Sequence, residues 1–142
     1  MRRRVDERQL PDALLMARIL VIDDHDLVRQ SVKAMVERGG HDVSVAADGR
    51  DGLKQLQAER FDLIITDILM PETDGLEVVK DLRKASGTVP IIAMSGGPSG
   101  RLPSWSATAD YLKMARLLGA TRTIEKPFGG AQLLALIAEC LL

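Results

Sequence analysis

The chain has little of three features that would place it in a specialised class. It contains one cysteine, Cys140, so no internal disulfide can form, which is typical of a reducing compartment. No run approaches the roughly 20 apolar residues that a membrane span requires. The formal net charge is −1, so no strong overall field favours nucleic acid or anionic lipid. We therefore expect a cytoplasmic protein that neither spans a membrane nor binds nucleic acid.

The length of 142 residues fits one domain with one hydrophobic core. Hydrophobic residues make up 46% and charged residues 27%, which is an ordinary globular composition. Residues 1–17 lie outside the pattern of strands and helices described below, and we expect a flexible or loosely docked extension there. The domain itself is expected over residues 18–142, with no room for a second domain after its last helix.

Short apolar runs alternate with segments of helical periodicity. Apolar residues recur at three- and four-residue spacing between the runs, as amphipathic helices require, and the fourth helix is expected near residues 108–118. Asp48 is expected to cap the second helix, and Asp24 or Asp26 the first. Five strand–helix pairs in strict alternation predict an α/β fold with parallel strands and helices on both faces of the sheet. The expected strands are residues 19–22, 43–46, 61–66, 89–94 and 121–124.

Polar side chains follow four of the expected strands at the point where each strand ends. Asp23 and Asp24 follow the first strand, Asp67 the third, Ser95 the fourth and Lys126 the fifth. Because the carboxyl ends of parallel strands share one edge, where α/β sheets bind ligands, we expect the five side chains to converge. Neighbouring carboxylates repel one another, and Lys126 with a hard divalent cation such as Mg²⁺ would supply the countercharge. Such a site is equipped for phosphoryl transfer.

Four motifs at these strand ends resemble the receiver domains of two-component response regulators. They occupy residues 22–25, 66–75, 94–96 and 125–128, and the resemblance covers about residues 18–142. It implies a flavodoxin-like (βα)5 fold, a doubly wound parallel sheet with strand order 2-1-3-4-5. It also implies a phosphoprotein of phosphorelay signal transduction, whose phosphoryl donor is a sensor histidine kinase or a histidine phosphotransfer protein.

The resemblance implies a metal-binding role for the acidic residues. Asp67 would be the phosphoacceptor. Mg²⁺ would be held by Asp24, by Asp67 and by the backbone carbonyl of Leu69, with Asp23 acting through a water molecule. We expect Mg²⁺-dependent self-phosphotransfer but no turnover enzyme.

The remaining rim residues would bind the transferred group. The resemblance implies that Ser95, Gly96 and Lys126 contact the phosphoryl group and that the bond before Pro127 is cis. Leu69 offers no polar side chain to position an attacking water, so we expect autodephosphorylation to be slow.

Two features depart from the receiver pattern. Thr123 stands where receivers usually carry Tyr or Phe, three residues before the lysine, so the usual aromatic switch cannot operate. Residues 96–106 form a longer loop than receivers usually have, and we expect Trp105 in it, or Tyr111, to contact a partner or replace the switch. Output is expected from a monomer or weak dimer to an unknown downstream protein, through the face of the fourth helix, fifth strand and fifth helix.

Two other functions stay open on the sequence. The altered switch position would also suit a phosphorylation-independent scaffold with the receiver fold. An aspartate-nucleophile phosphatase would need Asp-x-Asp on the first strand, which the adjacent Asp23 and Asp24 do not match. His25 is interpreted as a loop residue that titrates beside the acidic rim, and His41 as a surface residue before the second strand.

Overall fold

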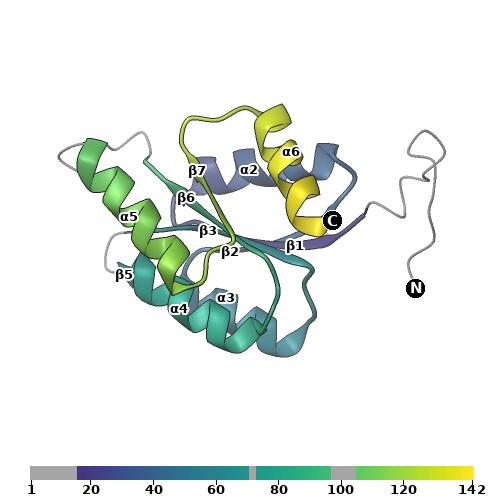
Figure 1. The fold of residues 1–142 in the computed structure, drawn as a ribbon. Helices are drawn as coiled ribbons and strands as arrows, with labels where there is room; N and C mark the ends of the chain where they lie inside the picture. The colour runs from purple at the N-terminus through teal and green to yellow at the C-terminus, as the bar shows by residue number, and fades with distance from the viewer. Residues whose placement is uncertain (1–15, 71–72, 97–104) are drawn as a thin grey trace.

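The computed structural model describes residues 16–70, 73–96 and 105–142. Five parallel strands form its main sheet in the order β2-β1-β3-β6-β7, which confirms the predicted order 2-1-3-4-5 (Figure 1). The strands are β1 (Arg18–Ile22), β2 (Asp42–Ala46), β3 (Leu63–Asp67), β6 (Ile91–Ser95) and β7 (Arg122–Glu125). The two edges of this sheet are β2 and β7, and Arg122 and Glu125 are exposed on the latter.

The inner strands are apolar because helices cover both faces of the sheet. Every residue of β3 and β6 is buried, as is β1 from Ile19 onward. Successive side chains point to opposite faces. Leu20 and Ile22 therefore join one core layer, whereas Ile19 and Val21 join the other.

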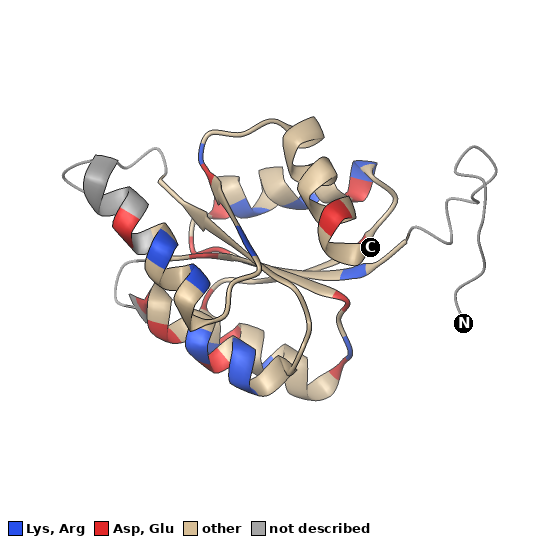
Figure 2. Cartoon of the chain, viewed as in Figure 1, with Lys and Arg blue, Asp and Glu red and all other residues tan. Residues whose placement is uncertain are grey.

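The five helices divide between the two faces of the sheet. Helices α2 (Asp26–Arg38) and α6 (Gly130–Leu141) pack on one face, and α3 (Gly49–Ala58), α4 (Gly75–Ser86) and α5 (Trp105–Leu118) on the other (Figure 1). Charged residues lie mainly on the outer sides of the helices and at strand ends, whereas the centre of the sheet is uncharged (Figure 2). None of the helices in the described part of the chain is long and apolar enough to cross a lipid bilayer.

The helix boundaries correct two predictions. The N-cap of α2 is His25, whose side chain accepts from the Val28 amide, so the expectation of an aspartate cap was wrong. Asp48 caps α3 as predicted, accepting from the Asp51 amide at 2.8 Å. Helix α5 begins three residues earlier than expected, at Trp105.

Two segments fall partly outside the described residues. Residues 97–104, most of the predicted loop insertion, lie outside them, and so do residues 1–15 of the predicted extension. Ala17, at the end of that extension, is buried. Its amide donates to His41 Nδ1 at 3.1 Å. His41 is half-buried, whereas the sequence analysis predicted a surface residue.

Candidate functional site

The acidic residues at the carboxyl edge of the sheet form one cluster. Asp23 and Asp24 directly follow β1, and Asp67 is the last residue of β3, which pairs with β1 in parallel. One carboxylate oxygen of each lies within 4.8 Å of those of the other two. Hard cations such as Mg²⁺ prefer oxygen ligands, so this donor set fits a divalent metal ion.

Lys126 bridges two of the three carboxylates. Its ammonium Nζ lies 3.0 Å from Asp23 Oδ2 and 3.2 Å from Asp67 Oδ2. The side chains of Asp23, Asp67 and Lys126 are 0, 5 and 8% exposed, so water screens these charges little. One ammonium does not balance three carboxylates, and the remaining negative charge favours a further cation.

Ser95 supplies the hydroxyl that was predicted for the site. The residue is fully buried at the end of β6, and its Oγ makes no hydrogen bond within the described part of the chain. Leaving a buried hydroxyl unpaired costs about 1–3 kcal/mol. A ligand oxygen beside Ser95 would remove that cost, so this atom fits a site that binds an oxyanion.

The backbone brings Ser95 and Lys126 to the same level. The Lys126 amide donates to the Ser95 carbonyl at 2.8 Å, and the following Lys126–Pro127 bond is cis, as expected. Gly96 has φ +73°, a conformation that residues with a side chain rarely adopt. A Cβ there would also lie 3.3 Å from the Lys126 carbonyl oxygen. Gly96 therefore allows the close passage of the chain between Ser95 and the lysine.

Arg29 was missed by the sequence analysis. Its Nη1 donates to the Asp23 carbonyl at 2.8 Å, while Asp23 Oδ1 accepts from the His25 amide at 2.9 Å. These bonds fix both the backbone and the carboxylate of Asp23. A basic residue in the first turns of a helix opposes the helix dipole, and that unfavourable position was a signal for a specific partner.

Gly75 was also missed, and it shapes the loop after Asp67. This loop contains the short antiparallel pair β4 (Leu69–Met70) and β5 (Thr73–Asp74). A Cβ at Gly75 would overlap the backbone of Ile68, so only glycine lets α4 start against the residue that precedes Leu69. The backbone carbonyl of Leu69, which was predicted as a metal ligand, belongs to this loop.

The predicted switch position lines a groove between the last strand and α5. Thr123 is in β7 and lines a groove of about 660 Å³ between that strand and α5. Leu117 beside it is 74% exposed. Trp105 and Tyr111 belong to α5, but their side chains lie outside what the structure describes.

Comparisons with known proteins agree with this geometry. A family model described as a response regulator receiver domain matches residues 19–138. The response regulator MprA of Mycolicibacterium vanbaalenii is 36% identical over 121 residues, which are 83% of this chain and 47% of that protein. The transcriptional regulatory protein PhoP of Bacillus subtilis is 34% identical over 112 residues, 78% of this chain and 42% of that protein.

A solved structure gives the same assignment over its whole length. The chemotaxis response regulator CheY4 of Vibrio cholerae superposes with a TM-score of 0.75 at 32% identity, covering 89% of this chain and 99% of that one. The chain spans about half the length of the curated relatives it matches. Fold, site and relatives together lead to one assignment: this chain belongs to the family of response regulator receiver domains.

Proposed function

We propose that the chain is a phosphoacceptor signalling module, phosphorylated on Asp67 from a phosphohistidine of a partner protein. The observation that carries this proposal is the position of Lys126, within 3.2 Å of Asp67 Oδ2 and 3.0 Å of Asp23 Oδ2. An ammonium there can balance the negative charge of the two carboxylates and of the oxygens of an incoming phosphoryl group. Receiver domains of response regulators receive their phosphoryl group from histidine kinases, which supports the same donor here.

The proposed step is an in-line displacement at phosphorus. A carboxylate oxygen of Asp67 forms the new O–P bond while the bond from phosphorus to the donor imidazole nitrogen breaks, and that nitrogen keeps the electron pair. Lys126 stabilises the negative charge on the equatorial oxygens. Ser95 Oγ, buried and without a partner among the described residues, donates a hydrogen bond to one of these oxygens, and the Gly96 amide is assigned to the same group.

Magnesium is the metal proposed for the acidic cluster. Receiver domains generally use Mg²⁺, and Asp24, Asp67 and the Leu69 carbonyl would hold it directly, with Asp23 acting through a water molecule. When bound, the ion supplies positive charge that offsets the repulsion between these carboxylates and the phosphoryl oxygens. Beyond this transfer and a slow autodephosphorylation we propose no enzymatic turnover.

Output is proposed to occur by protein contact in the cytoplasm. Helix α5, strand β7 and helix α6 form the predicted output face, and the groove beside Thr123 lies on it with Leu117 exposed at its rim. Because Thr123 has no aromatic ring, the coupling of phosphorylation to the output face would use backbone motion at Gly96 or the side chains of α5.

A phosphorylation-independent scaffold is the second candidate, and the Thr123 position favours it. It predicts the same partner binding with and without a phosphoryl group on Asp67. The phosphatase alternative predicts turnover of a phosphomonoester without any donor protein. Partner binding with and without the phosphoryl group separates the scaffold from the main proposal, and a phosphomonoester turnover assay separates the phosphatase.

The test is incubation with a small acyl-phosphate donor and Mg²⁺, comparing the wild type with Asp67→Asn. We expect stoichiometric, acid-stable but base-labile phosphorylation of the wild type and none of the variant. Asp110→Asn, an exposed aspartate on α5, is the matched control and should label like the wild type. Equal labelling of the wild type and Asp67→Asn would refute the proposal.

A further inference from the structure

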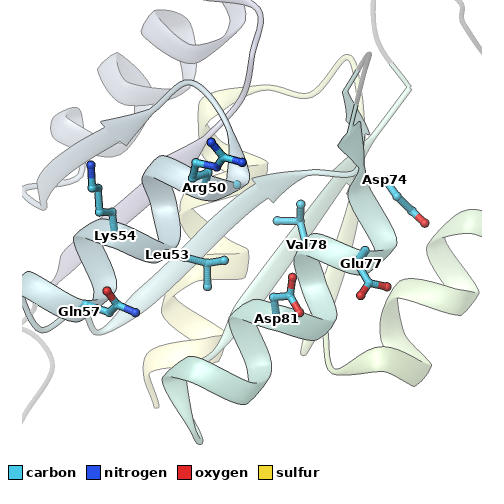
Figure 3. A pocket seen from close by; sticks show the side chains of 9 residues that line it. Arg50, Leu53, Lys54, Gln57, Asp74, Glu77, Val78 and Asp81 are labelled. Carbon is cyan, nitrogen blue, oxygen red and sulfur yellow. The ribbon is translucent and has the colours of Figure 1, made fainter.

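Helices α3 and α4 leave a shallow groove of about 570 Å³ on the face opposite α2 and α6. Its floor is apolar: Leu53 of α3 and Val78 of α4 line it, and their side chains lie between the two helices in Figure 3. This groove is separate from the acidic cluster and from the groove beside Thr123.

The two walls of the groove carry opposite charges. Arg50 and Lys54 project from α3, and Glu77 and Asp81 from α4 (Figure 3). None of the four makes a salt bridge with any other residue that the structure describes. Each helix therefore presents to the groove two charges of one sign, four residues and hence about one turn apart, without a salt-bridge partner among the described residues.

The charged residues of α3 and α4 lie at matching heights along the two helix axes. Both helices begin at the edge of the sheet that bears the acidic cluster and run in the same direction. Arg50 and Lys54 are the second and sixth residues of α3, whereas Glu77 and Asp81 are the third and seventh of α4. The α3–α4 face is thus basic on one side and acidic on the other at two successive levels.

We propose that a second copy of this chain covers the α3–α4 face, related by a two-fold axis parallel to the two helices. Such an axis places α3 of each copy against α4 of its partner and keeps every residue at the same height along the helix axes. Arg50 then meets Glu77, and Lys54 meets Asp81, twice in the dimer. Leu53 and Val78 supply the apolar centre that a specific interface needs.

The charge pattern selects this arrangement over the other two-fold arrangement of the same face. An axis perpendicular to the helices within the interface would place α3 on α3 and α4 on α4. Like charges would then face each other at every level, which costs several kcal/mol in an interface. The proposed dimer does not depend on phosphorylation of Asp67, so its test is independent of the test of the proposed function.

Charge reversal tests the proposal in solution. Sedimentation equilibrium of the full chain over a concentration series should show a dimer that weakens as salt is added, because the pairs are partly screened. Arg50→Glu with Lys54→Glu makes both walls acidic, and Glu77→Lys with Asp81→Lys makes both basic. Each double variant alone should dimerise more weakly by about tenfold or more.

An equimolar mixture of the two double variants should regain the dimer as a heterodimer, because each reversed wall then meets a wall of opposite charge. The quadruple variant, with both walls exchanged, should dimerise by itself. Circular dichroism and thermal unfolding of each variant check that the fold is retained. This rescue distinguishes a charge-paired interface from a general effect of net charge.

Lys113→Glu with Arg116→Glu, on the groove of α5 and β7, is the matched control and should leave the dimer unchanged. The proposal is overturned by a wild type that stays monomeric throughout the series, by double variants that dimerise like the wild type, or by loss of rescue in the mixture. A dimer abolished by the control pair would place the interface on the other face and overturn it equally.

Discussion

His41 shows how one side chain ties a chain terminus to the sheet. Its Nδ1 accepts the Ala17 amide across 24 residues of sequence, which requires the unprotonated nitrogen. Burial lowers the pKa of His41 below its ordinary value of 6.5, because a partly desolvated imidazolium is unfavourable. The interaction could not be predicted from the sequence, since the neighbouring Gly40 and the charged Asp42 resemble an exposed turn.

The lowered pKa of His41 predicts a pH-dependent loss of stability. Since the unfolded chain binds this proton more readily than the folded chain, the contribution is complete above pH 6.5 and is lost as pH falls through the folded pKa. In His41→Asn, whose amide oxygen can accept the same bond without titrating, that part of the loss should vanish. Urea unfolding of both proteins between about pH 7 and 5 measures it, and parallel curves would contradict the assignment.

Among the elements, α4 is joined to the far end of the sheet by one arginine. Arg83, in the last turn of α4, donates to the Gly119 carbonyl from Nε at 3.1 Å and from Nη2 at 2.8 Å. Its Nη1 donates to the carbonyls of Val89 at 2.8 Å and Gly87 at 2.6 Å. Arg83 therefore connects the loop before β6 with the loop before β7, at the end of the sheet opposite the acidic cluster.

Replacing Arg83 by methionine should lower the free energy of unfolding by about 1–3 kcal/mol, because several carbonyls lose their donor. Lys84→Met, one residue further along the same helix and exposed, is the matched control and should change stability little. Denaturant unfolding monitored by circular dichroism makes the comparison. Equal midpoints for the two variants would show that water replaces Arg83 without cost.

The regular elements were predictable to different degrees. The strands and the acidic rim follow from the sequence because β1, β3 and β6 are largely apolar runs. Asp23 directly follows β1, whereas β3 and β6 end in Asp67 and Ser95. The start of α5 does not follow from the sequence, because residues 105–110 contain a single large apolar side chain and so show no amphipathic repeat. The cap of α2 was missed because Asp24 takes part in the acidic cluster, which leaves His25 to accept the Val28 amide.

For the whole molecule, the acidic cluster should link metal binding to folding. Folding brings the third carboxylate, Asp67, beside Asp23 and Asp24, so a cation that binds the native state alone stabilises it. At a Mg²⁺ concentration about ten times the dissociation constant, the free energy of unfolding rises by about 1.4 kcal/mol. We expect the melting temperature of the wild type to rise by several degrees.

Asp24→Asn should reduce this rise, because it removes one of the proposed metal ligands, whereas Asp110→Asn should keep it. Differential scanning calorimetry with Mg²⁺ and with the chelator EDTA makes the measurement. A melting temperature of the wild type that does not change with Mg²⁺ would argue against a metal ion at the cluster.

The two edges of the sheet limit how copies of this molecule can meet. Strand β7 is only four residues long and exposes Arg122 and Glu125, and β2 begins with the exposed Asp42. Charged side chains on short edge strands oppose backbone pairing with a strand from another chain, the usual start of fibrous aggregation. The folded protein should therefore stay free of intermolecular β-structure at high concentration, and associate through its helices.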